Sequence, residues 1–78
     1  MNIVFLGGGK MAEAIVAGLL RDGVCEANQV VVCEIVEERR AHLAATLGVG
    51  VVGTVAEAVR DADVVFLAVK PQVLGSVL

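Results

Sequence analysis

The chain has 78 residues, of which 58% are hydrophobic, and its formal net charge is −3. This length allows one small domain, and the longest apolar runs, residues 3–6 and 64–69, are far too short to span a bilayer. The six basic residues are scattered along the chain, whereas a nucleic-acid-binding surface needs them clustered. We therefore expect a soluble protein with no nucleic-acid partner and no membrane partner.

The two cysteines indicate a reducing compartment. Cys25 and Cys33 have neither a metal-ligand spacing nor the pattern of a disulfide framework. Cys33 falls inside an apolar run, where a buried reduced thiol is expected. No basic segment precedes the first apolar run, so the N-terminus does not have the pattern of a signal peptide. We expect a cytoplasmic protein without a metal site.

Apolar runs alternate with segments of helical period in the first half of the chain, a pattern typical of βαβ units and a parallel sheet. The predicted elements are a strand over residues 2–6, a helix over residues 11–20 and a strand over residues 29–34. The helix is predicted because Met11, Ile15 and Leu19 recur at helical spacing. An Asp-Gly pair at residues 22 and 23 ends it.

The second half continues the alternation. The predicted elements are a helix over residues 37–47, a strand over 49–52, a helix over 55–62 and a strand over 63–69. Leu43 and Leu47 lie on the apolar stripe of the first of these helices, and Gly48 is its expected C-cap. Thr54 and Glu57 have the spacing of a capping box at the start of the next helix.

A glycine-rich segment joins the first strand to the first helix. Residues 7–12, Gly-Gly-Gly-Lys-Met-Ala, match the pattern G-x-G-x-x-A. Gly7 allows the tight turn, Gly9 lets the backbone approach a diphosphate, and Ala12 keeps the helix close to the strand. The phosphates then lie at the helix N-terminus, where free amides and the helix dipole favour negative charge. The alternative is a glycine turn that serves close packing alone.

This motif and the order of the elements predict an α/β fold, the first half of a Rossmann-type doubly wound parallel sheet with strand order 3-2-1-4. Pro71 suits the first turn of a further predicted helix. The sequence ends at Leu78, about two turns into that helix. We therefore expect residues 1–78 to be the N-terminal part of a dinucleotide-binding domain in a longer protein.

Glu34 ends the second predicted strand 22 residues after Ala12, where this fingerprint expects an acidic residue that accepts the ribose hydroxyls. A carboxylate there would repel the 2′-phosphate of NADP. Arg39 and Arg40 follow closely and are the alternative, since they can reach such a phosphate. A third interpretation is that all three are solvated charges at the start of a helix.

Residues 68–72, Ala-Val-Lys-Pro-Gln, close the fourth predicted strand. In an open α/β sheet the ligand lies beyond the carboxyl ends of the strands, near the switch point beside the first strand. Pro71 keeps Lys70 out of helical geometry and extends this loop. The turn is therefore expected to face the cofactor, the alternative being a plain strand-to-helix turn with a surface lysine.

Two segments resemble a known family. Residues 3–15, IVFLGGGKMAEAI, resemble the opening of pyrroline-5-carboxylate reductases, which catalyse the last step of proline biosynthesis. Residues 62–72, ADVVFLAVKPQ, resemble the fourth-strand signature of that family more closely. The resemblance implies hydride transfer from NAD(P)H to the imine carbon of 1-pyrroline-5-carboxylate, a small-molecule substrate.

The resemblance also implies which residues bind the cofactor. The residues expected to line the diphosphate are Leu6, Gly7, Gly8, Gly9, Lys10 and Met11, with Ala12 packed behind them. Glu34 is expected at the adenosine ribose. The residues expected on the nicotinamide side are Ala68, Val69, Lys70 and Pro71. The family's substrate pocket and oligomer interface lie in a C-terminal helical domain outside this chain, so we expect a homo-oligomer and assign no catalytic residue here.

Three positions depart from the family pattern. Lys10 stands where the family often has Asn, and Val55 where many members have Asn. Glu34 stands where Ser, Thr or Asp is common, which favours NADH over NADPH. Two other interpretations stay open: another reductase with the same first half, such as a coenzyme F420-dependent NADP oxidoreductase or a β-hydroxyacid dehydrogenase, and a non-catalytic nucleotide-binding module. His42, in the middle of a polar helix, is expected to be a surface residue.

Overall fold

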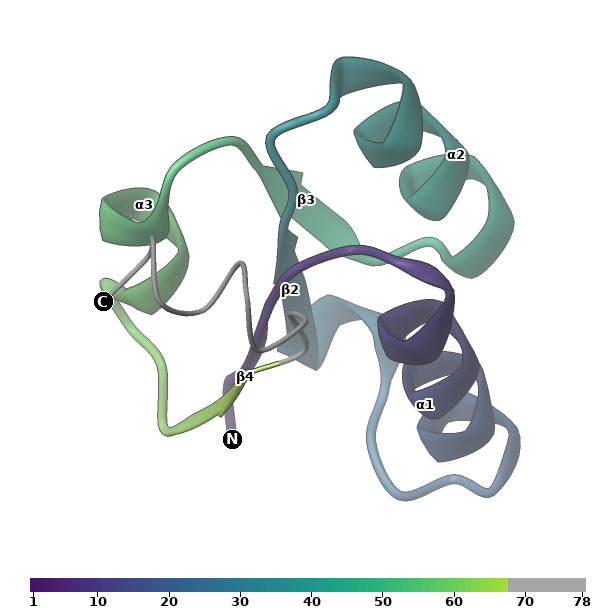
Figure 1. The fold of residues 1–78 in the computed structure, drawn as a ribbon. Helices are drawn as coiled ribbons and strands as arrows, with labels where there is room; N and C mark the ends of the chain where they lie inside the picture. The colour runs from purple at the N-terminus through teal and green to yellow at the C-terminus, as the bar shows by residue number, and fades with distance from the viewer. Residues whose placement is uncertain (68–78) are drawn as a thin grey trace.

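The computed structural model describes residues 1–67. Its elements are β1 (Ile3–Leu6), α1 (Lys10–Arg21), the 3-10 turn η1 (Ala27–Gln29), β2 (Val30–Cys33), α2 (Glu37–Leu47), β3 (Gly50–Val52), α3 (Val55–Val59) and β4 (Val64–Leu67). Figure 1 shows a sheet with α1 and α2 on one side and α3 on the other. Within residues 1–67, no helix has the length and apolar character that a membrane span requires.

The four strands form one parallel sheet in the order β3-β2-β1-β4. This confirms the predicted strand order and the Rossmann-type fold. β1 lies in the middle, with Leu6 level with Cys33 of β2 and with Leu67 of β4. The carboxyl ends of these three strands therefore meet at one edge of the sheet, the edge where an open α/β sheet binds its ligand.

Hydrophobic side chains pack on both faces of the sheet. Phe5 of β1, Val16 of α1 and Leu43 of α2 are fully buried on one face. Val4 of β1 and Ala58 of α3 are buried on the other, in a smaller cluster. Because β1 has helices on both sides, all of its side chains are buried, and this explains its uninterrupted apolar sequence.

The predicted apolar stripe of α1 is wrong in two of its three positions. Met11 is 69% exposed and Ile15 is 42% exposed. Ala12 and Val16 are buried instead, and Leu19 packs against the same core. The glycine turn sets the rotation of α1 so that the small Ala12 lies against the sheet, which moves the buried stripe one residue along the helix.

The other helices follow their predicted signals more closely. α2 has the predicted bounds, and Gly48 ends it with φ 71°, the left-handed conformation of a glycine C-cap. α3 ends at Val59, three residues earlier than predicted. The Thr54 hydroxyl accepts a hydrogen bond from the Glu57 amide, but it donates to the Glu57 carboxylate, so half of the predicted capping box forms.

Candidate functional site

The glycine turn lies between β1 and α1, at the carboxyl edge of the sheet. Gly7 has φ 110°, a conformation that side chains rarely allow. Its amide donates to the carbonyl of Cys33 at 2.9 Å, which ties the turn to the end of β2. Leu6, the last residue of β1, is buried beneath the turn. The sharp turn that the motif predicts is thus present, with the N-terminus of α1 directly after it.

Gly9 faces open space. It is the N-cap of α1, with φ −74°, so its backbone does not itself require glycine. Within the described part of the chain, no heavy atom lies within 4 Å of a Cβ built at this position. Ala12, one turn later, is 1% exposed and holds α1 against the sheet. This geometry leaves room for a group at the amides of the first turn of α1, as a diphosphate site needs.

Gly8 is buried, whereas Gly7 is half-buried and Gly9 is exposed, and sequence reasoning missed this difference. A Cβ at Gly8 would lie 2.9 Å from Cδ1 of Leu43 and 3.0 Å from Cβ of Glu34. Gly8 is the variable position of the G-x-G pattern, so the motif assigns it no role. The three consecutive glycines thus have three different environments: a positive φ, a close packing contact and an open face.

The Glu34 carboxylate bridges the glycine turn and the start of α2. Its Oε1 accepts from the Gly8 amide at 3.0 Å, and its Oε2 accepts from the Val36 amide at 2.8 Å. Glu34 was predicted as the last residue of the second strand, and it lies one residue beyond the end of β2 at Cys33. The structure brings it to the glycine turn, and its contact with a ribose stays a prediction.

Arg39 and Arg40 both donate to main-chain carbonyls near the turn. Nε and Nη2 of Arg39 donate to the Gly8 carbonyl at 3.2 and 2.7 Å. Nη1 of Arg40 donates to the Glu34 carbonyl at 2.7 Å. The interpretation of Glu34 and the two arginines as solvated charges is therefore wrong. All three side chains form hydrogen bonds with main-chain groups of the glycine turn or of the segment between β2 and α2.

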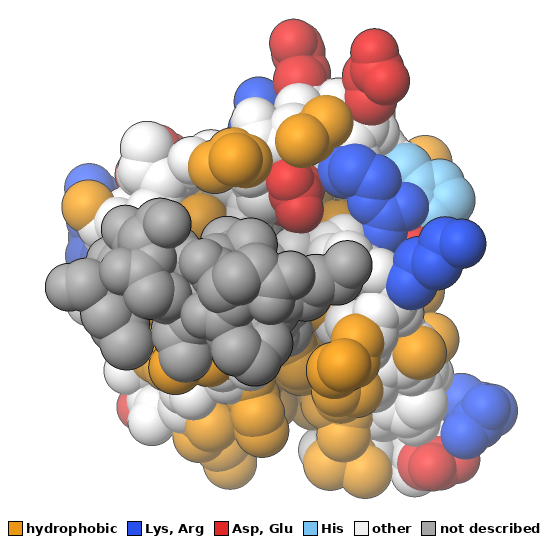
Figure 2. All heavy atoms as spheres, viewed as in Figure 1, with side chains coloured by type: hydrophobic (Ala, Val, Ile, Leu, Met, Phe, Trp, Pro, Cys, Tyr) orange, Lys and Arg blue, Asp and Glu red, His pale blue; other side chains and the backbone are white. Residues whose placement is uncertain are grey.

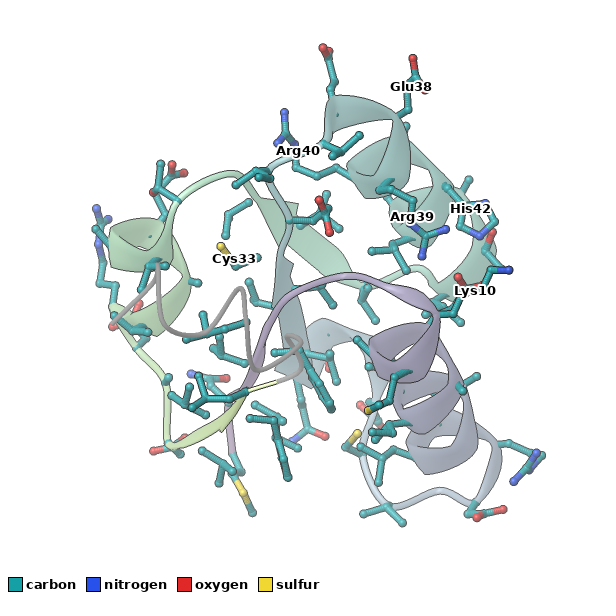
Figure 3. All side chains as sticks on the ribbon, viewed as in Figure 1. Lys10, Cys33, Glu38, Arg39, Arg40 and His42 are labelled. Carbon is teal, nitrogen blue, oxygen red and sulfur yellow. The ribbon has the colours of Figure 1, made fainter. Side chains whose placement is uncertain are left out.

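Arg39 belongs to a small charged cluster between α1 and α2. Its Nη2 lies 3.0 Å from Oε1 of Glu13, and Nε2 of His42 lies 3.1 Å from Oε2 of the same carboxylate. The hydrogen bonds with His42 and Arg39 hold the pKa of the Glu13 carboxyl below its usual range. His42 is exposed, as predicted. Figure 3 labels Arg39 and His42 close together on the side of α2 that faces α1, with Lys10 below them.

An open hollow of about 510 Å³ borders this cluster. Its lining residues are Lys10, Glu13, Ala14, Ala17, Arg39 and His42. Figure 2 shows Lys and Arg side chains beside the histidine on this side of the molecule. Among the described residues that line the hollow there is none of the three turn glycines, although Lys10 directly follows them.

Several predicted features fall elsewhere. Ala68, Val69, Lys70 and Pro71 lie outside the described residues. Cys33 is buried and free, as predicted, and its burial raises the pKa of the thiol, with the nearby Glu34 carboxylate adding to the effect. Within residues 1–67 there is no group of histidine, cysteine and acidic residues placed to hold a metal ion.

Comparisons with known proteins place this chain in a family. A pyrroline-5-carboxylate reductase from Treponema pallidum is 38% identical over 78 residues, which is all of this chain and 30% of that protein. One from Pseudomonas aeruginosa is 44% identical over 76 residues, covering 97% of this chain and 28% of the relative. The solved structure of a pyrroline-5-carboxylate reductase from Coxiella burnetii superposes with a TM-score of 0.89 at 36% identity, covering 97% of this chain and 28% of that one.

These comparisons confirm the resemblance drawn from residues 3–15 and 62–72. The chain spans less than a third of the length of these relatives. One family model matches the chain, and its description names an oxidoreductase that uses a nicotinamide cofactor. This description is that of the coenzyme F420-dependent reductase, which the sequence analysis kept as an alternative. With a match over residues 2–78, the chain belongs to the family described as "NADP oxidoreductase coenzyme F420-dependent".

Proposed function

We propose that this chain is the NAD(P)H-binding N-terminal portion of a longer oxidoreductase that reduces 1-pyrroline-5-carboxylate to proline. The observation that carries the proposal is the glycine turn at the carboxyl end of β1, with a positive φ at Gly7 and open space at Gly9. The names of the relatives supply the substrate, a small molecule. The share of their length that this chain covers supports a substrate-binding domain downstream, and we also propose that the whole protein is a homo-oligomer.

The open space at Gly9 supports a dinucleotide at the glycine turn. Residues 6–11 would line the diphosphate, Ala12 would keep α1 close behind it, and the first amides of α1 would face the phosphate charge. Glu34 would lie at the adenosine ribose, and residues 68–71 would contact the nicotinamide side. When bound, the nicotinamide supplies the hydride that the imine carbon of the substrate accepts.

The same contacts support a preference for NADH. The Glu34 carboxylate would lie near the 2′-phosphate of NADPH and repel it. Arg39 and Arg40, the cations that sequence reasoning set against this repulsion, already donate to the carbonyls of Gly8 and Glu34. Their charge is therefore directed toward the protein's own main chain.

The compartment is a further proposal. Cys25 and Cys33 are both free thiols, which fits a protein that works in a reducing cytoplasm. That the protein has neither a nucleic-acid nor a membrane partner stays a prediction from composition.

The test uses the full-length protein with 1-pyrroline-5-carboxylate and each nicotinamide cofactor. We expect NAD(P)H oxidation, followed by the loss of absorbance at about 340 nm, that depends on the imine and yields proline. The description of the matching family supports a second candidate, the exchange of hydride between NADP and coenzyme F420. Oxidation of reduced F420 by NADP without any turnover of the imine would favour that candidate and contradict our proposal.

A further inference from the structure

Both polar groups of the Gly8 main chain are held by side chains from the segment after β2. The amide of Gly8 donates to Oε1 of Glu34, and its carbonyl accepts from Nε and Nη2 of Arg39. A run of three glycines has more backbone freedom than any other tripeptide, so an ordered turn here loses more conformational entropy on folding. These contacts restrict the middle glycine directly.

Arg39 is itself held in place. The same Nη2 that donates to Gly8 lies 3.0 Å from the Glu13 carboxylate, in the first turn of α1. His42 contacts the other oxygen of that carboxylate. The planar guanidinium carries its N–H groups in a fixed fork, so it can meet the Gly8 carbonyl and Glu13 together, which a lysine ammonium on a flexible stem does less well. The Arg39 side chain is 32% exposed, so solvent competes for these contacts only in part.

The Gly8 carbonyl and the Gly9 amide belong to the same peptide group. A peptide group is planar, and in the trans form its C=O and N–H point in opposite directions. No peptide bond among residues 1–67 is cis. By fixing the direction of the Gly8 carbonyl, Arg39 therefore also fixes the Gly9 N–H, which points away from Arg39. Gly9 is the residue whose missing side chain leaves open space.

We propose that Arg39 is a positioning residue for the dinucleotide: it aims the Gly9 amide at the diphosphate by holding the Gly8 carbonyl. The proposal rests on the proposed function, in that the glycine turn must bind a dinucleotide. It differs from the sequence-based alternative, in which this arginine contacts the 2′-phosphate of NADPH. A 2′-phosphate contact affects NADPH alone, whereas an aimed diphosphate amide affects NADH and NADPH equally.

The experiment compares Arg39→Gln, Arg39→Lys and the parent in the full-length protein. Arg21→Gln is the matched control, because Arg21 is an exposed arginine paired with Asp22 on the far end of α1. We expect Arg39→Gln to raise the Kd of NADH and of NADPH by the same factor, roughly tenfold, since hydrogen bonds from a charged group are lost. KM for the cofactor should rise with it, while kcat at saturating cofactor stays within about twofold. Arg39→Lys should recover part of the affinity, and Arg21→Gln should match the parent.

Other outcomes overturn the proposal. A loss confined to NADPH would assign Arg39 to the 2′-phosphate, and unchanged affinity for both cofactors would leave it no positioning role. If Arg39→Gln does not fold, as judged by its thermal transition, Arg39→Lys decides the question by the same equal-factor criterion. A parent protein that binds neither dinucleotide would overturn the proposed function and this inference together. An Arg39→Gln variant with parental Kd and KM for both cofactors, in a parent that binds them, would overturn this inference alone.

Discussion

The amide of Gly8 and the carboxylate of Glu34 are joined by a hydrogen bond of 3.0 Å, although 26 residues separate them in the sequence. The contact brings the end of β2 against the glycine turn that follows β1. It also places a negative charge beside the turn before any cofactor is considered. Two consequences can be tested, one for packing at Gly8 and one for cofactor choice at Glu34.

Adding a methyl group at Gly8 should destabilise the fold. The new Cβ would meet the fully buried Leu43 at 2.9 Å and the Cβ of Glu34 at 3.0 Å, so the turn or α2 must shift. We expect Gly8→Ala to lower the free energy of unfolding by about 1–3 kcal/mol. Urea titration followed by circular dichroism measures this change. An unfolding midpoint equal to that of the parent would contradict the packing that the structure gives Gly8.

The matched change at Gly9 should have the opposite profile. Gly9 has an ordinary φ and, among the described residues, no atom within 4 Å of its Cβ position, so Gly9→Val should fold with nearly parental stability. A branched side chain would occupy the space proposed for the diphosphate and weaken NADH and NADPH binding by at least roughly tenfold. Fluorescence titration of the folded variant checks this. Near-parental cofactor affinity would remove the diphosphate from Gly9.

The sequence predicts those features of the fold and the site that depend on residues close together in the chain. The bounds of α2, the Gly48 cap and the strand order follow from periodicity, a glycine signal and the alternation of elements, and all were predicted. The predicted buried face of α1 was wrong because Met11–Ile15 and Ala12–Val16 are both apolar pairs at helical spacing. The glycine turn before α1 decides which of the two pairs faces the sheet. The contacts of Arg39 with Gly8 depend on how α2 packs against the turn, and no local pattern carries that information.

Removing the charge of Glu34 should shift cofactor preference towards NADPH. Glu34→Gln keeps an oxygen that can accept from the Gly8 amide but loses the repulsion of a 2′-phosphate. We expect the ratio of kcat/KM for NADPH to that for NADH to rise roughly tenfold, within the about 1–3 kcal/mol that such a repulsion costs. Steady-state kinetics of the full-length protein give both ratios. A parent that already prefers NADPH strongly would show that Glu34 does not set the preference.

The Glu13 carboxylate should make part of the stability depend on acid. Its pKa in the folded protein is lowered, first by the hydrogen bond with His42 and then by that with Arg39. A group with a lowered folded pKa contributes stability above its unfolded pKa, about 4.3 for a glutamate, and the contribution is lost as the pH falls through the folded value. We expect Glu13→Gln to reduce stability at pH 6 and to flatten its decline below pH 4. Unfolding free energies measured at pH 6 and over a series of values below pH 4, with Glu38→Gln on the exposed face of α2 as the control, check both effects.

The fourth strand gives the last prediction. Among the described residues β4 is an edge of the sheet, paired with β1 alone, and Val65, Phe66 and Leu67 are 44%, 43% and 53% exposed. An exposed apolar edge strand is a template for pairing with another chain. We therefore expect residues 1–78, produced alone, to self-associate, with Val65→Lys weakening the association because a charged side chain blunts such an edge. Because we propose that the substrate-binding groups lie downstream, the same preparation should not reduce 1-pyrroline-5-carboxylate: holding two reactants in place supplies as much as ~7–11 kcal/mol of a barrier, and it would be missing. Sedimentation over a range of concentrations and an NAD(P)H oxidation assay test the two parts separately. A monomer at every concentration would contradict the first, and oxidation that depends on the imine would contradict the second.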